Sequence, residues 1–118
     1  MKAPKKERRV EERTVWLIFH DKKVALRQRP PKGLLAGLWE YPNELSPARC
    51  PVAGAEGRAA TGKHIFTHVE WHMTARVVLA ETEELPEGWV WADKAELEGV
   101  FAVPGAFAPF ARLVEEHL

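Results

Sequence analysis

The sequence predicts an α/β or α+β fold in which one mixed β-sheet packs against helices. Runs of β-branched and aromatic residues occupy the start and the middle of the chain, whereas the helix signals lie near its end. The 118 residues are enough for one hydrophobic core and too few for a catalytic domain with an accessory one. With 46% hydrophobic residues and five tryptophans, the composition is that of a globular protein.

The first predicted element is a β-hairpin. Thr14–Phe19 is rich in β-branched and aromatic residues and predicts a buried strand, and Val24–Arg27 alternates after the polar turn at residues 21–23. Pro30-Pro31-Lys32-Gly33 ends the hairpin. A loop flanked by Gly33 and Gly37 then leads into a short predicted strand over Leu38–Tyr41.

The later elements are a strand region followed by helices. Residues 43–62 are interrupted by prolines and glycines, and we expect them to be irregular. A long strand or strand pair is predicted over Thr67–Glu81 and a further strand over Trp89–Trp91. Asp93 and Glu96 form a capping box for a helix over Lys94–Leu97. A last helix, about Gly105–His117, has a one-sided apolar stripe formed by Phe107, Phe110, Leu113 and Val114.

Charge is distributed unevenly although the net charge is zero. Residues 1–37 contain 11 Lys and Arg against 4 acidic residues, and residues 38–118 contain 6 against 13. We expect residues 1–13 to be a charged linker or arm and residues 14–118 to be the folded domain. The remaining basic excess lies on and beside the first predicted strands and could hold phosphates, through Lys22, Lys23, Arg27, Arg29 and Lys32.

The sequence argues against a membrane span, an internal disulfide and a metal site. No apolar run approaches a membrane span or follows a signal-peptide pattern, so we expect a cytoplasmic protein. One cysteine, Cys50, cannot form an internal disulfide or a four-thiolate site. His64, His68 and His72 are spaced by four, but the β-branched residues around them favour a strand. In one strand His64 and His72 would lie about 26 Å apart, and we therefore expect no metal site.

Residues 29–42, RPPKGLLAGLWEYP, resemble the entry loop of a Nudix fold. A hydrolase of that fold continues with a helix whose paired glutamates hold magnesium against a diphosphate. Between Pro42 and Gly62 this chain has only Glu44 and Glu56 as acids, separated by prolines and glycines. The resemblance thus implies a Nudix-like mixed sheet packed against helices, without a working Nudix box.

Three segments together resemble the C-terminal domain of MutY-type adenine DNA glycosylases, namely Leu35–Pro42, His64–Trp71 and Val103–Phe107. The resemblance spans roughly Arg13 to Leu118. It implies an 8-oxoguanine-recognising domain of a glycosylase that removes adenine mispaired with 8-oxoguanine or guanine in base excision repair. The implied partners are double-stranded DNA containing 8-oxoguanine opposite adenine and the helical catalytic domain of the same parent chain. That missing domain would carry the [4Fe–4S] cluster, and we expect this chain alone to be non-catalytic and to hold no cofactor.

The same resemblance assigns the reading residues. The family's loop reads Phe-Ser-His and contacts 8-oxoguanine, which implies roles for Phe66, Thr67 and His68. Thr67 departs from the serine of that pattern but keeps the hydroxyl. Oxidation at C8 converts N7 of guanine into a donor and adds an acceptor at O8, and a hydroxyl with neighbouring backbone N–H groups can answer both. Lys32 and Lys63 are candidate phosphate contacts or, alternatively, solvated surface lysines.

Several alternatives stay open at this point. Phe66 could instead be a core residue, and the five tryptophans could form a stacking platform for single strands, although we expect them to pack in the core. The chain could be an active Nudix-type pyrophosphohydrolase on oxidised nucleotides, or a protein–protein adaptor that has kept only the fold. The hydrolase would need scattered metal ligands from among Glu40, Glu44, Glu56 and Glu70.

Overall fold

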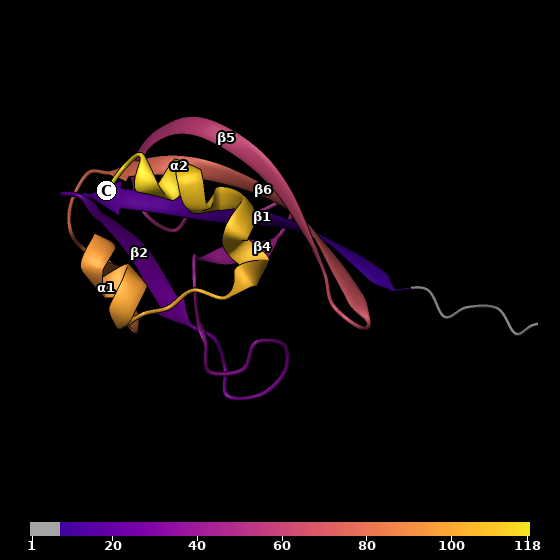
Figure 1. Ribbon diagram of the computed structural model, residues 1–118. Coiled ribbons are helices and arrows are strands. Elements are labelled where there is room, and N and C mark those ends of the chain that lie inside the picture. The colour runs from indigo at the N-terminus through magenta and orange to yellow at the C-terminus, as the bar shows by residue number, and fades with distance from the viewer. Residues whose placement is uncertain (1–7) are drawn as a thin grey trace, which may run out of the picture.

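A seven-stranded mixed sheet with short helices packed on it forms the part of the chain that this computed structural model describes, residues 8–118 (Figure 1). The expected α+β class with a mixed sheet is confirmed. The main strand order is β3-β2-β1-β6-β5, with β4 paired to β1 and β7 paired to β2. The strands are β1 (Arg9–His20), β2 (Lys23–Gln28), β3 (Trp39–Glu40), β4 (Asn43–Leu45), β5 (Gly54–Ile65), β6 (Val69–Ala80) and β7 (Trp89–Ala92).

The central strand, β1, divides its edges between three neighbours. Along one edge it pairs in parallel with β6, from Arg9 opposite Val69 to Phe19 opposite Leu79. The other edge is shared, because β4 pairs with Arg13–Val15 and β2 only with the last two residues of β1. Since β7 occupies one edge of β2, β3 must share the other edge of β2 with β1. β2 and β4 therefore diverge along β1, and a cleft opens between them.

The β1–β2 hairpin follows the sequence prediction. Asp21 and Lys22 form its two-residue turn with φ angles of 50° and 60°. Two successive positive φ angles are typical of the type I′ turn, whose twist matches that of paired strands.

The expected linker over residues 1–13 is wrong for residues 9–13, because β1 begins at Arg9. Residues 1–7 lie outside the described part of the chain. Backbone pairing with β6 holds this stretch, and one of its acids, Glu11, is partnered within it. Glu11 accepts hydrogen bonds from Arg9 at 2.9 Å and from Arg13 at 3.1 Å. These contacts, with burial acting in the opposite direction, lower the pKa of Glu11. Pairing with a distant strand thus overrides the polar pattern.

The middle of the chain also differs from the prediction. Residues 43–62 are not irregular, because they contain β4 and most of β5. The low strand propensity of the glycines and alanines in β5 is offset by antiparallel pairing with β6, with a bulge between Glu56 and Ala59. The predicted long strand is present as β6, but it begins at Val69 rather than Thr67.

Three helical elements follow the strands, namely α1 (Lys94–Gly99), the 3₁₀ helix η1 (Gly105–Phe110) and α2 (Ala111–Glu115). The predicted capping box is confirmed, since Glu96 N–H donates to Asp93 Oδ1 at 2.8 Å and Asp93 N–H to Glu96 Oε1 at 3.1 Å. The single last helix that we expected is instead divided into η1 and α2. Pro109 lies inside η1 and has no N–H to donate. The apolar stripe is nevertheless buried.

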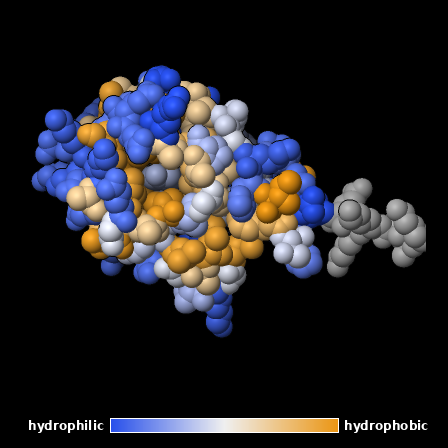
Figure 2. All heavy atoms as spheres, viewed as in Figure 1, coloured by the Kyte–Doolittle hydropathy of each residue, from blue (hydrophilic) through white to orange (hydrophobic). Residues whose placement is uncertain are grey.

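The core lies mainly between the sheet and the η1–α2 segment. Trp71, Phe107 and Phe110 are among its largest fully buried side chains. A second, smaller cluster surrounds Trp16 and Ile18. No helix within residues 8–118 is long and apolar enough to cross a membrane. Figure 2 shows hydrophobic surface at the loop that precedes β3 and on the arm formed by β5 and β6, where Leu34, Leu38 and Ile65 are exposed.

Candidate functional site

The tip of the β5–β6 hairpin is the first candidate site. The hairpin projects beyond the helices as a long arm (Figure 1), and Thr67 and His68 form the turn between Phe66 and Val69. Phe66 N–H donates to the Val69 carbonyl at 2.7 Å, and Arg9 N–H of β1 donates to the His68 carbonyl at 3.1 Å. Two strands thus fix the backbone of the turn while the side chains of Thr67 and His68 stay exposed.

Phe66 is packed more firmly than its two neighbours. Its ring is half-buried against the core and makes edge contacts with Trp71, at 4.9 Å between centroids, and with His64, at 4.6 Å. The alternative that Phe66 is a core residue therefore accounts for the buried part of its ring. A contact between this ring and a base stays a prediction.

A depression of about 610 Å³ lies beside the hairpin tip. It brings together the two segments that stood out in the sequence, because Leu34 of the glycine-flanked loop lines it with Phe66, Thr67 and His68. Arg9, whose guanidinium pairs with Glu11 at 2.9 Å, also lines this depression. The surface therefore combines an apolar group, a hydroxyl, an imidazole and a guanidinium, which suits a nucleotide.

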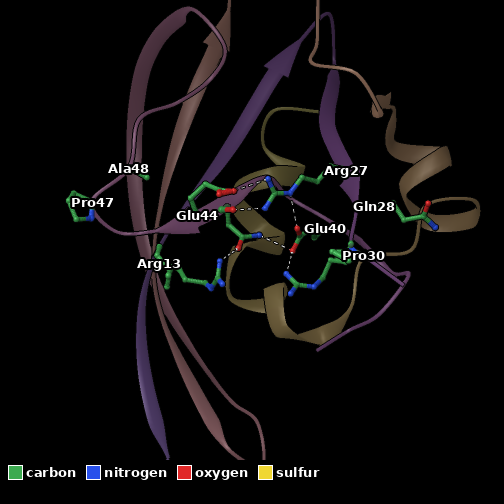
Figure 3. Close-up of a pocket in the computed structure, with 11 residues that line it drawn as sticks. Arg13, Arg27, Gln28, Pro30, Glu40, Glu44, Pro47 and Ala48 are labelled. Atoms are coloured by element: carbon green, nitrogen blue, oxygen red, sulfur yellow. Dashed lines mark hydrogen bonds and ion pairs between the residues drawn. The ribbon is translucent and has the colours of Figure 1, made fainter. Parts of the chain in front are cut away.

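The cleft between the diverging strands, here called the fork cleft, is the second candidate site (Figure 3). It has a volume of about 760 Å³. Glu40 of β3 lies at its base and is 1% exposed. Its Oε2 accepts from Arg27 Nε at 2.8 Å, and its Oε1 accepts from Arg29 Nη1 at 2.8 Å and from Asn43 Nδ2 at 2.9 Å. Both carboxylate oxygens are thus engaged within the protein.

The arginines of the fork cleft are likewise engaged internally. Arg27 also donates to Glu44 Oε1 at 3.1 Å and to the Asn43 carbonyl. Arg13 donates to Asn43 Oδ1 at 2.7 Å. This network was not predicted, although an acid between Trp39 and Tyr41 is a sequence signal for a buried carboxylate that needs cationic partners.

The basic residues that we expected to hold phosphates over residues 14–37 differ in their surroundings. Arg27 and Arg29 face Glu40 and are engaged within the protein. Lys22 and Lys23 lie at the β1–β2 turn, and a role of these lysines in phosphate binding stays a prediction.

Arg29 connects the fork cleft to the hairpin. Its Nε donates to the Leu34 carbonyl at 2.8 Å, and its guanidinium lies 5.3 Å from the centroid of the buried Trp71 ring. Arg13 also lies over that ring, at 4.7 Å. Because Trp71 contacts Phe66, the two candidate sites share one set of packed side chains.

The argument from strand length against a histidine site is wrong, because the histidines lie on two paired strands. His64 is opposite Trp71 and His72 is opposite Lys63, so neighbouring pairs of the ladder hold them. Residues 8–118 nevertheless contain no group of three or more His, Cys, Asp or Glu side chains arranged to hold a metal ion. His72 Nε2 instead lies 3.1 Å from Glu70 Oε2, and Arg8 lies 3.3 Å from Oε1. These contacts lower the pKa of Glu70.

The remaining candidate residues are dispersed. Lys32 and Lys63 are both exposed, two residues before Leu34 and three before Phe66, and their phosphate contacts stay predictions. Glu44 pairs with Arg27, and Glu56 lies 3.9 Å from Arg76. The stretch between β4 and β5, residues 46–53, contains no helix.

Comparisons with known proteins agree with this architecture. The sequence pattern of the NUDIX domain matches residues 14–113, whereas no curated protein sequence matches the chain. One similar structure is the C-terminal domain of mouse MUTYH in complex with human PCNA, which is 24% identical over 91% of this chain and 88% of that one, with a TM-score of 0.63.

Nudix hydrolases are similar as well. The MutT protein from Methanosarcina mazei Go1 is 14% identical over 93% of this chain and 96% of that one, with a TM-score of 0.71. The MutT NUDIX hydrolase from Burkholderia pseudomallei is 18% identical over 93% and 98% respectively, with a TM-score of 0.63. At these identities the likeness concerns the fold.

Proposed function

This chain belongs to the NUDIX domain family, and we propose that it is a member that reads a DNA lesion. Specifically, it would be the 8-oxoguanine-recognising domain of an adenine DNA glycosylase that removes adenine mispaired with 8-oxoguanine or guanine. Likeness to the C-terminal domain of mouse MUTYH supports this proposal. The adenine-excising chemistry and the [4Fe–4S] cluster would belong to a separate helical domain of the parent chain.

The observation that carries the proposal is the fixed hairpin tip. Its backbone is held by hydrogen bonds from Phe66 and Arg9, and the side chains of Thr67 and His68 are exposed beside the depression. A reader that distinguishes one oxidised base needs polar groups whose positions do not adjust to the undamaged base. Thr67 supplies a hydroxyl that can accept from N7–H, which guanine lacks.

Binding of the 118-residue chain to two duplexes tests the proposal. One duplex carries 8-oxoguanine opposite adenine and the other carries guanine opposite adenine. We expect weak, salt-sensitive binding, because the net charge is zero and the fork arginines are engaged. The duplex with the lesion should nevertheless bind more tightly. Equal affinities for the two duplexes at low salt would contradict the proposal.

Substitutions of Thr67 separate hydrogen bonding from packing. Thr67→Ala should reduce the preference for 8-oxoguanine by roughly 1–3 kcal/mol, as expected for one lost polar contact. Thr67→Ser should stay close to the original chain. Thr67→Val keeps the branched shape without the hydroxyl, so a Val variant that discriminates as well as Thr would disprove the role of this hydroxyl.

Likeness to MutT proteins makes pyrophosphohydrolase activity the second candidate. The state of Glu40 argues against it, because this buried carboxylate already accepts three hydrogen bonds, from Arg27, Arg29 and Asn43, and has little remaining capacity to bind a metal. Incubation with magnesium and 8-oxo-dGTP should therefore release no pyrophosphate above a blank. Turnover that Glu44→Gln or Glu56→Gln abolishes would favour the hydrolase instead.

A further inference from the structure

The depression beside the hairpin tip has a second wall that the proposed reading residues do not provide. Leu34 lines the depression together with Thr67 and His68 and is 36% exposed, so its aliphatic side chain is accessible to a ligand bound at the hairpin tip. We propose that Leu34 contacts the lesion nucleotide and that Arg29 positions Leu34. This inference rests on the proposed function and extends it from the hairpin to the loop that precedes β3.

Hydrogen bonds within the loop brace the segment that carries Leu34. Arg29 N–H donates to the Leu38 carbonyl at 2.8 Å, and Gly37 N–H donates to the Pro30 carbonyl at 2.9 Å. Gly33 and Gly37 adopt φ angles of 92° and 73°, which favour glycine. These contacts close the loop on itself.

Backbone strain in the same loop accompanies the exposure of Leu34. Leu35 has a φ of 52°, and the left-handed region costs a non-glycine residue about 1–2 kcal/mol. The Leu35 side chain packs against the main core, and this packing offsets the strain. A strained residue held by its surroundings is a frequent property of binding sites. Here it directs two successive leucines differently, with Leu35 toward the core and Leu34 toward the depression.

Arg29 sets the position of the Leu34 backbone relative to the hairpin. One guanidinium joins the Leu34 carbonyl, at 2.8 Å, to Glu40 Oε1, also at 2.8 Å, and it lies over Trp71. Trp71 contacts Phe66 at the base of the hairpin tip. Only a planar, multidentate donor can serve the carbonyl, the carboxylate and the ring at once, so lysine is not an equivalent substitute.

The chemistry of the two walls indicates a nucleotide bound in duplex DNA. Leu34 offers an aliphatic surface for a base or sugar, Thr67 offers the hydroxyl, and Arg9 offers a cation on the same rim. With Leu34 on one side, the nucleotide can approach Thr67 in fewer orientations. The apolar wall thereby contributes to discrimination as well as to affinity.

The loop provides a matched control for the test. Leu38 belongs to the same loop and is 43% exposed, but it does not line the depression. Binding to the two duplexes is measured by fluorescence anisotropy for the original chain, Leu34→Ala and Leu38→Ala. We expect Leu34→Ala to weaken binding to the 8-oxoguanine duplex by about three- to tenfold and to reduce its preference over the guanine duplex. Leu38→Ala should leave both affinities unchanged.

A double-mutant cycle tests the positioning role of Arg29. Arg29→Lys should reduce the preference for 8-oxoguanine in the original chain and have little further effect in the Leu34→Ala background. The melting temperature of each variant shows whether a reduced preference for the 8-oxoguanine duplex comes from a destabilised domain. If Arg29 had only a structural role, Arg29→Lys would lower the melting temperature equally in both backgrounds, and its effect on the preference would not depend on Leu34.

The outcomes distinguish the two proposals. If the original chain prefers the lesion and Leu34→Ala behaves like Leu38→Ala, the role of Leu34 is wrong while the lesion-reading function stands. Additive effects of Arg29→Lys and Leu34→Ala on the preference would overturn the positioning role. If the original chain shows no preference between the duplexes, both proposals fail together.

Discussion

Replacing Glu40 by glutamine should destabilise the domain far more than the same change at Glu44. Both carboxylates bond to Arg27, at 2.8 Å and 3.1 Å respectively. The side chain of Glu40 is 2% exposed and that of Glu44 is 53% exposed. The pair of substitutions therefore compares one chemical change in a buried and an exposed position.

The magnitude follows from the partners that Glu40 leaves behind. Removing one member of a buried ion pair typically costs 3–5 kcal/mol, because the other charge stays uncompensated. The side chains of Arg27 and Arg29 are 24% and 15% exposed, so water can solvate part of the released charge. We therefore expect a loss of about 2–4 kcal/mol for Glu40→Gln. The exposed pair is worth about 0–1 kcal/mol, and Glu44→Gln should lose no more than that.

Urea denaturation followed by tryptophan fluorescence measures both free energies of unfolding. At about 4 °C per kcal/mol, Glu40→Gln should also lower the melting temperature by roughly 8–16 °C. Equal losses of unfolding free energy for the two variants would refute the reasoning, because they would mean that the arginine charges left at the buried site are solvated as well as those at the surface. Unchanged stability in Glu40→Gln would show that the amide replaces the carboxylate without penalty.

Two further predictions concern packing and ionisation. Gly62→Ala should cost about 1–3 kcal/mol, because the added Cβ would lie 2.7 Å from Pro109 Cβ, whereas Gly57→Ala on the same strand meets Val77 Cγ1 at 3.6 Å and should be nearly neutral by the same denaturation assay. Burial, with a smaller contribution from the Glu115 charge, raises the pKa of Tyr41 to about 12, and Tyr41 is the only tyrosine. Its tyrosinate absorbance should therefore appear near pH 12 in the folded protein and near pH 10 in denaturant. The contribution of the protonated Tyr41 to the free energy of unfolding is complete below pH 10 and is lost as the pH rises toward 12. A native midpoint near 10 would mean that this ring is not buried in solution.

The elements that the sequence predicted are those whose signals are local. The β1–β2 turn at Asp21 and the capping box at Asp93 depend on residues a few positions apart, and both are present. β5 has no such signal. Its glycines and alanines are extended because β6 pairs with them, and a preference that comes from a partner strand is not visible in the strand itself.

The candidate site was predictable only in part, because some of its features depend on contacts between distant segments of the chain. The resemblance placed Thr67 and His68 in a loop, whereas the residue types alone favoured a strand, because neither residue takes a positive φ and the turn needs no glycine or asparagine to mark it. The buried Glu40 network joins residues from four strands. Which arginine meets which acid depends on the divergence of β2 and β4, a property of the folded sheet.

The parallel pairing of β1 with β6 has a consequence for the order of folding. Every residue pair in that ladder joins positions sixty apart in the chain, whereas the β5–β6 hairpin joins neighbours across a two-residue turn. Contacts between distant residues carry a larger loop-closure entropy and form more slowly. The hairpin can therefore form early, while the bond from Arg9 N–H to the His68 carbonyl must wait for β1. In refolding measured by hydrogen exchange, amides of the β5–β6 pairing should gain protection before those that join β1 to β6.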